Sequence, residues 1–283
     1  MNRTGFDAIR SPVPAGGAED YRLAFGDLAT KGLQQFVRDE RFGDDLCVFI
    51  HIPKTAGTSL SAEFNRLRTP YHNIHRRYST GEPITFTSIE EEMASLIDSG
   101  ELAHARSCSG HFSYEQTAPI RAARPDARFV TFLRDPVARV ISDYRYARTP
   151  AHPTYRTFID RFPRIDDYVV AKQTRNKMAR FLLPRSMTEA AEIEAFVSTR
   201  LAFVGLLELY PMSFNILTRL LGADAMPIEH RRRTERTADN AVDEDADLRR
   251  LILEHNAVDR LLYDIVHRRL VAAHDDWLTE TRG

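Results

Sequence analysis

The feature that most constrains this chain is a short hydrophobic run, LCVFIHI at residues 46–52, which stops abruptly at the loop PKTAGTS. Its length and its β-branched content predict a buried strand. A helical pattern opens at Thr58 and continues roughly to Leu67. A strand that enters a polar loop and then a helix is typical of a phosphate-binding loop, yet the G-x-x-x-x-G-K-S/T spacing of an ordinary P-loop is absent. It is therefore an open question which ligand a loop with an early lysine, Lys54, and a single glycine, Gly57, would bind.

Strand and helix patterns alternate along the rest of the chain. RFVTFLR at 128–134 is a second buried strand, and the Asp135-Pro136 pair after it suits a helix start. Shorter strands are predicted in ARSCSGHF and AFVGLLE, and SIEEEMASLIDSG is predicted to be a helix capped by Ser88. We expect a long polar connection at 66–83 and a helical pair at 242–275. This alternation predicts an α/β fold with a mostly parallel central sheet flanked by helices.

Length and composition are those of an ordinary globular protein, with 283 residues, 43% hydrophobic residues and a net charge of −1. We expect an N-terminal arm with a short helix at 1–40 and a single domain at 41–283. Cys47 and Cys108 lie in strand-like surroundings and are expected to be reduced, buried thiols. No stretch approaches the ~20 apolar residues that span a bilayer, and no secretory signal is visible, so we expect a cytoplasmic protein. The near-zero net charge disfavours a general nucleic-acid binder.

Three chemically useful residues each follow a predicted strand. They are Lys54, His111 and Arg134. Ligands of parallel α/β sheets bind at the carboxyl ends of the strands, so these three side chains are expected to face one crevice.

Two segments have the chemistry of anion binding. In PKTAGTS, backbone N–H groups and the positive end of the following helix are joined by a lysine and by hydroxyl groups, although the same pattern suits a plain helix cap after a core strand. In FLRDPVARVISDYRYAR, Arg134 ends a strand and Ser142 follows two helical turns later, so that both could hold a phosphate. The later arginines of that helix are expected to be solvated; these are Arg139, Arg145 and Arg148.

Together these two motifs resemble the sulfotransferases that use 3′-phosphoadenosine 5′-phosphosulfate (PAPS). FIHIPKTAGTS is most similar to the branch that contains the heparan and dermatan/chondroitin sulfate O-sulfotransferases and their bacterial relatives. The likeness extends to SGHFSY, FVGLLE and HNAVDRLLYD, and covers roughly residues 45–270. It implies the P-loop-nucleotide-kinase-like fold of sulfotransferases, with PAPS as co-substrate.

The resemblance divides the donor between two anion sites. It implies that the 5′-phosphosulfate is held by the loop Lys54, Thr55, Ala56, Gly57, Thr58 and Ser59, with Lys54 on the bridging oxygen. It assigns the 3′-phosphate to Arg134 and Ser142. RRRTERT resembles the late loop that closes over the nucleotide, where Arg236 and Thr237 are the candidate contacts, although the asparagine usual near its centre is missing.

The acceptor side is implied less completely. His111 in SGHF matches the catalytic histidine of the uronyl 2-O-sulfotransferases, and Glu115 is either a rival base or a group that orients His111. His51, inside the first predicted strand, is expected to be a packed core residue.

Other candidate substrate contacts each have a structural alternative. Arg76 and Arg77 could bind an anionic sugar or form a solvated face. Asn176, in RNKMARFLL, resembles a segment beside the substrate cleft and could be purely structural.

The expected activity is transfer of a sulfuryl group from PAPS to an acceptor hydroxyl of a carbohydrate or glycolipid, with a secondary metabolite as a further acceptor class. No metal-binding pattern is evident, and the absent membrane anchor fits a bacterial cytosolic enzyme. One alternative is a small-molecule or nucleotide kinase with a degenerate P-loop, for which Asp135 would be the metal-binding acid. The other is a non-catalytic module that binds a sulfated glycan or a nucleotide.

Overall fold

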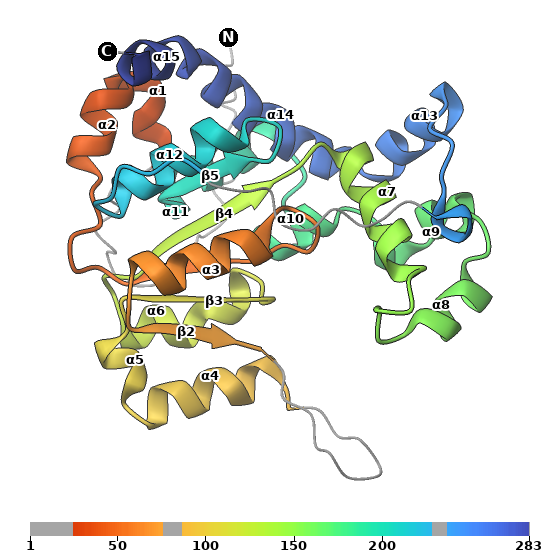
Figure 1. Cartoon of the computed structure of the whole chain (residues 1–283), viewed down its shortest axis with the longest axis horizontal. Helices are drawn as coiled ribbons and strands as arrows, with labels where there is room; N and C mark the ends of the chain where they lie inside the picture. The colour runs from red at the N-terminus through yellow and green to blue at the C-terminus, as the bar shows by residue number, and fades with distance from the viewer. Residues whose placement is uncertain (1–24, 76–86, 228–236, 283) are drawn as a thin grey trace, which may run out of the picture.

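The structure is a computed structural model that describes residues 25–75, 87–227 and 237–282. Its centre is a five-stranded sheet in the order β2-β3-β1-β4-β5 (Figure 1), in which every neighbouring pair is parallel. The strands are β1 Cys47–Ile50, β2 Tyr71–Ile74, β3 Ser107–Gly110, β4 Arg128–Leu133 and β5 Phe203–Leu206. The expected α/β fold with a parallel central sheet is confirmed.

The register of the sheet brings the ends of its central strands to one edge. Ile50 at the end of β1 pairs with Gly110 on β3 and with Thr131 on β4. The Thr131 hydroxyl donates to the Ile50 carbonyl at 2.8 Å. The segments that follow β1, β3 and β4 therefore leave the sheet next to one another.

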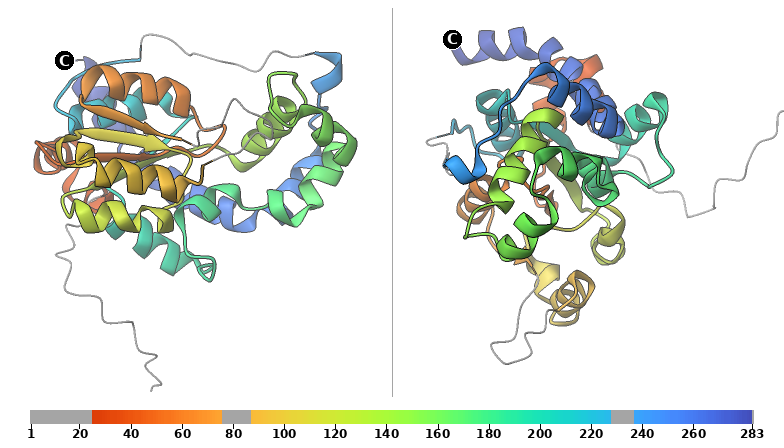
Figure 2. Two further views of the ribbon diagram at one scale, coloured as in Figure 1. Left: turned by 90° about the horizontal axis from the view of Figure 1, so that it is seen from below. Right: turned by 90° about the vertical axis from the view of Figure 1, so that its right-hand side faces the viewer.

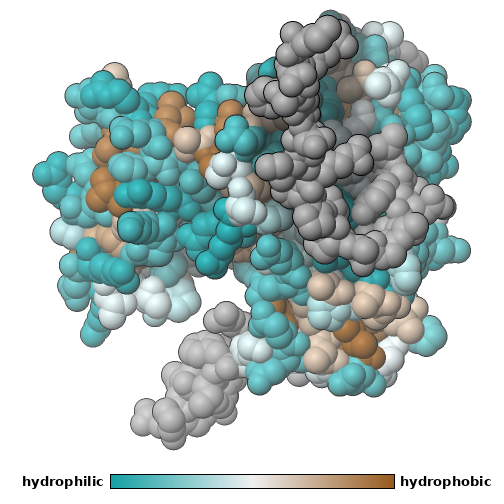
Figure 3. Space-filling view, turned by 180° about the vertical axis from the view of Figure 1, so that it is seen from behind, coloured by the Kyte–Doolittle hydropathy of each residue, from teal (hydrophilic) through white to brown (hydrophobic). Residues whose placement is uncertain are grey.

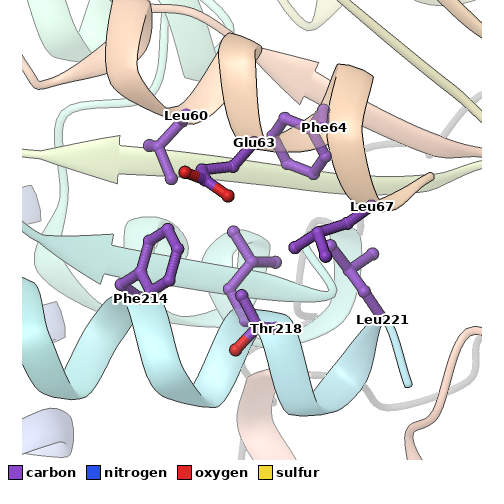
Figure 4. A pocket seen from close by; sticks show the side chains of 8 residues that line it. Leu60, Glu63, Phe64, Leu67, Phe214, Thr218 and Leu221 are labelled. Carbon is purple, nitrogen blue, oxygen red and sulfur yellow. The ribbon is translucent and has the colours of Figure 1, made fainter. Parts of the chain in front are cut away.

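Helices pack on both faces of the sheet. Figure 4 shows α3 and α12 facing each other on one side, and Figure 2 (left) shows α6 on the other. The described helices are η1 Phe25–Asp27, α1 Leu28–Lys31, α2 Leu33–Asp39, α3 Gly57–Leu67, α4 Ile89–Asp98, α5 Glu101–His104, η2 Glu115–Thr117, α6 Ala118–Ala123, α7 Pro136–Ala147, α8 Tyr155–Arg161, α9 Ile165–Val170, η3 Lys172–Thr174, α10 Lys177–Leu182, α11 Ala190–Arg200, α12 Tyr210–Leu220, η4 Ala238–Asn240, α13 Ala246–His255, α14 Ala257–Ala272 and α15 His274–Arg282.

The buried hydrophobic residues form two clusters. The larger one surrounds the sheet and includes Phe49, Phe132 and Phe203, together with Phe25 and Phe36 from the N-terminal helices. The smaller one, which we call the helical cluster, consists of Val137, Val140, Tyr144, Phe162, Tyr168, Val169, Leu248 and Ile252. Its helices α7, α8, α9 and α13 lie beyond the carboxyl ends of the strands (Figure 1). The edge at which ligands of such sheets bind therefore faces a second packed body.

One predicted connection is partly a strand. Residues 66–83 were expected to be a polar connection, but β2 lies within them, so that expectation is wrong. β2 is an edge strand in which only Ile74 is buried, and for that reason it has no hydrophobic run. The Tyr71 hydroxyl lies 2.6 Å from the Ser109 hydroxyl on β3 and holds the pair together.

The two cysteines are free and buried, as predicted. Burial raises the pKa of Cys47 to about 12 and also raises that of Cys108. Neither thiol is therefore a nucleophile at neutral pH.

The surface seen from behind is largely hydrophilic, with hydrophobic residues in scattered groups (Figure 3). In the described part of the chain, the exposed large hydrophobic residues are Val170, Met226, Leu261 and Val271. Such scattering is ordinary for a protein surface in water. None of the helices within the described ranges combines the length and the hydrophobicity needed to cross a bilayer.

Candidate active site

The loop between β1 and α3 holds its shape through its own backbone. Lys54 and Ala56 have φ angles of 72° and 76°, a left-handed conformation that costs a non-glycine residue roughly 1–3 kcal/mol. Thr55 is fully buried, and its hydroxyl donates to the Ile52 carbonyl at 2.9 Å. The Ser59 N–H donates to the Ala56 carbonyl at 3.2 Å and closes the first turn of α3. The loop thus delivers the N-terminus of α3 to the carboxyl edge of the sheet.

Gly57 is required by a side chain that precedes the loop. A Cβ atom at Gly57 would lie 1.7 Å from Cδ2 of His51, so the imidazole fills the space where a side chain would stand. His51 follows the end of β1 and is half-buried beside His111, which corrects the expectation that it belongs to the core. Burial, assisted by His111, lowers the pKa of His51 to about 3. His51 is therefore a neutral wall of the site.

His111 follows β3 and leans on His51. The two ring centroids are 4.1 Å apart, and Nδ1 of His111 lies 2.8 Å from the backbone carbonyl oxygen of His51. Because a carbonyl oxygen only accepts, Nδ1 carries the proton, and the neutral ring has its lone pair on Nε2. His111 is exposed to solvent, while partial burial lowers its pKa; the hydrogen bond to His51 opposes this shift and Lys177 assists it. His111 therefore has the form of a general base at neutral pH.

Lys54 and Arg134 meet at the end of the loop. Nζ of Lys54 lies 4.2 Å above the ring of Tyr146 on α7. Nη1 of Arg134, directly after β4, donates to the Lys54 carbonyl at 3.4 Å. Burial lowers the pKa of Lys54; Asp143 opposes this shift, while Arg134 and Arg145 assist it. Lys54 and Arg134, two cations that follow the neighbouring strands β1 and β4, therefore lie close together.

Helix α7 begins as its sequence predicts. The Asp135 carboxylate accepts from the Ala138 N–H at 2.8 Å, and Pro136 occupies the first turn. Ser142 is half-buried on the same helix, two turns after Arg134.

The expectation that Arg139, Arg145 and Arg148 are solvated is wrong. Arg139 is fully buried and donates to Asp143 at 3.2 Å. Arg145 is half-buried, with its Nε fully enclosed. Arg148 donates from Nε to the Asp239 carbonyl at 2.8 Å and so ties η4 to the end of α7. The alternating charged residues of this helix suggested a solvated surface, but one of its faces is buried and Arg139 is paired with Asp143 there.

Asp143, a buried carboxylate that was not recognised from the sequence, pairs with two cations, Arg139 and Lys177. Asp143 accepts hydrogen bonds from Arg139, from the Tyr168 hydroxyl at 2.8 Å and from Nζ of Lys177. Burial alone would raise the pKa of Asp143, but Lys177 and Arg139 hold it below its ordinary value. The i, i+4 spacing of Arg139 and Asp143 was a local signal for this pair. Lys177, 34 residues away, had none.

Asn176 is bound within the fold. Its φ angle is 47°, and its side-chain oxygen accepts from the N–H groups of Val258 and Asp259, each at 3.1 Å. In return, the Asp259 carboxylate accepts from the N–H groups of Met178 at 3.2 Å and Ala179 at 2.7 Å. Helices α10 and α14 therefore cap each other, and this arrangement holds Lys177 beside Asp143.

The remaining candidates are spread around this centre. Glu115 is exposed on η2. Thr237 is exposed at the start of η4, where its N–H donates to the Asn240 side chain at 3.0 Å. Arg76, Arg77 and Arg236 lie outside the described residues. Within the described ranges, no group of three or more His, Cys, Asp or Glu side chains is arranged to hold a metal ion.

The described residues also line hollows away from this centre. A cavity of about 10 Å³ between α3 and α12 is lined by Leu60, Glu63, Phe64, Leu67, Phe214, Leu217, Thr218 and Leu221 (Figure 4). At most one water would fit there. A hollow of about 670 Å³ is lined by Gln34, Val37, Arg38, Arg41, Arg219, Gly222, Ala223 and Asp224. It lies by α2, at the opposite end of the sheet from the strand ends that carry Lys54, His111 and Arg134 (Figure 1).

No protein-family model matches this chain, and no curated protein matches its sequence. Among solved structures, a sulfotransferase from Alicyclobacillus acidocaldarius is 20% identical over 80% of this chain and 98% of that chain, with a TM-score of 0.44. Mouse sulfotransferase SULT7A1, complexed with PAP, is 14% identical over 82% of this chain and 72% of that chain, with a TM-score of 0.34. These values assign neither a family nor an activity to the chain, so its function has to be inferred from its own residues.

Proposed function

We propose that this chain is a PAPS-dependent O-sulfotransferase that moves a sulfuryl group to an acceptor hydroxyl of a carbohydrate or glycolipid. The observation that carries the proposal is the grouping of three features at one sheet edge. These are a lysine-bearing loop at a helix N-terminus, a second cation from the neighbouring strand, and a histidine whose Nε2 can take a proton.

The donor would occupy two anion sites. The N-terminus of α3 and Lys54 suit the 5′-phosphosulfate, because backbone N–H groups and the helix dipole favour negative charge there. Arg134 suits the 3′-phosphate, because its one described hydrogen bond uses only one of five N–H groups. Ser142 adds a hydroxyl from the next turns of α7. Thr237, and with it Arg236, would supply the contacts of the late loop with the nucleotide, as the resemblance implies.

In the reaction, Nε2 of His111 takes the proton of the acceptor hydroxyl. The acceptor oxygen then forms a bond to sulfur in line with the bond that breaks, and the electron pair of that bond moves to the departing phosphate oxygen. Lys54 neutralises the charge that grows there, and the His51 carbonyl steadies the imidazolium through Nδ1. Positioning and fixed charge supply the rate, as in phosphoryl transfer.

The acceptor contacts are proposed from sequence alone. Arg76 and Arg77 are the candidate cations for an anionic sugar. Asn176 is a candidate neighbour of the substrate cleft, and its side-chain oxygen also caps α14. Glu115 remains the alternative base. A bacterial, cytosolic setting and a reaction without a metal complete the proposal.

The test is a calorimetric titration with 3′-phosphoadenosine 5′-phosphate (PAP), the expected product, without metal, and a parallel titration with ATP and Mg²⁺. We expect PAP to bind to the wild type. Its dissociation constant should be at least about 30-fold higher for Arg134→Ala, because a charged partner of a phosphate is removed. The control is Arg38→Ala on α2, which should bind PAP like the wild type. Preference for ATP and Mg²⁺ would make the chain a kinase, and binding of neither would overturn catalysis with PAPS.

A further inference from the structure

A third histidine stands beside the candidate site, in the segment between α7 and α8. The ring centroid of His152 lies 5.2 Å from that of Tyr146, and this tyrosine is the one whose ring carries Nζ of Lys54 at 4.2 Å. His152 is half-buried. His152 and the lysine of the anion-binding loop therefore pack against the same aromatic ring.

The backbone fixes the position of this histidine. The N–H and the hydroxyl of Thr149 donate to the Tyr146 carbonyl at 3.0 and 2.7 Å. The His152 N–H donates to the Thr149 carbonyl at 2.9 Å, and the Tyr155 N–H donates to the His152 carbonyl at 3.0 Å. Consecutive turns thus carry the imidazole back toward the end of α7.

The hydrogen bonds of the ring define its tautomer. The Thr154 N–H donates to Nδ1 of His152 at 3.3 Å, and the Thr154 hydroxyl lies 3.2 Å from the same atom. Because a backbone N–H only donates, Nδ1 has no proton and the neutral ring carries it on Nε2. Burial lowers the pKa of His152; Asp143 opposes this shift, and Lys177 and Lys54 assist it. At neutral pH His152 is therefore a donor at Nε2, whereas His111 is an acceptor at Nε2.

We propose that His152 donates a hydrogen bond from Nε2 to a non-bridging oxygen of the sulfuryl group held by Lys54. This inference rests on the proposed function. A bound sulfuryl group presents three such oxygens, and oxygens withdrawn from water without donors are costly. The proton stays on His152, and no bond to this residue forms or breaks. One histidine then orients the group that is transferred, while the other takes the proton from the acceptor.

Two substitutions at this position separate a ligand contact from a structural role. Asparagine places a carboxamide oxygen near the Nδ1 position, where it can accept from Thr154, but it does not reach the Nε2 position. Glutamine extends an amide N–H group to the Nε2 position. We expect His152→Asn to release PAP from PAPS about 10²-fold more slowly than the wild type, with water as acceptor, and His152→Gln to stay within about fivefold.

Binding of PAP is the internal control, because this product has no sulfuryl group. Both variants should bind PAP like the wild type and unfold at the wild-type temperature. The reverse order of rates, or equal rates in all three proteins, would overturn the role of His152 while leaving the proposed function intact. If the wild type itself does not bind PAP, the proposed function fails, and this inference fails with it.

Discussion

At the scale of single residues, Gly57 has an unexpected reason to be glycine. Phosphate loops commonly need glycine for left-handed backbone, but here Lys54 and Ala56 adopt that conformation instead. Gly57 gives room to the His51 ring, which in turn supports His111. A search for a P-loop by counting glycines therefore misses this loop, because its glycine serves a neighbouring side chain.

This arrangement predicts a steric effect of Gly57→Ala. The new methyl group would displace the His51 ring, and we expect a loss of about 1–3 kcal/mol in the free energy of unfolding, measured in urea. In the double variant with His51→Ala the methyl group has room, so the combined loss should be smaller than the sum of the two single losses. Strict additivity would show that the two residues do not collide.

The surroundings of His111 predict the acid limb of the pH–rate profile. A base acts only when it is deprotonated, so turnover falls as the pH drops through the pKa of His111. That pKa is lowered from 6.5, so we expect full turnover at neutral pH and its loss only below the ordinary histidine range. His111→Ala should be ~10²–10⁴-fold slower and should lack this limb. An unchanged limb in the variant would assign the base to another group, with Glu115 the first candidate.

At the scale of elements, the mutual caps of α10 and α14 join segments that are 80 residues apart. We expect Asn176→Ala to lower the free energy of unfolding by about 2–3 kcal/mol, because two partly buried N–H groups lose their acceptor and the left-handed backbone loses a suitable residue. Asp245→Ala is the matched control, since it removes an ordinary cap at α13, worth about 1 kcal/mol. Equal losses in urea unfolding would contradict the special role of Asn176.

The elements that could be predicted are those with a local signal. The hydrophobic runs of β1, β4 and β5 were recognised, as was α4, where Ser88 and Glu91 form a capping box. Asp135 and Pro136 correctly marked the start of α7. β2 could not be recognised, because an edge strand that buries only Ile74 has the same pattern as a polar loop.

At the scale of the whole molecule, part of the candidate site followed from topology. Once a parallel sheet was predicted, the residues after its strands were expected at one edge, and Lys54, His111 and Arg134 do lie there. Asp143, Lys177 and His152 were not recognised, because they come from the helices and turns that pack against this edge. Only the folded chain brings them to it, and no spacing in the sequence records that they meet.

The protons of the two site histidines are placed by main-chain groups, the carbonyl of residue 51 for one ring and the N–H of residue 154 for the other. Every amino acid has such a carbonyl, and every one except proline has such an N–H. A change of side chain at position 51 or 154 therefore leaves these main-chain groups in place. His111 would still accept a proton at Nε2, and His152 would still donate from Nε2. Besides the two imidazoles themselves, the feature that must be kept is the path of the two loops, because it places the main-chain groups that set each tautomer.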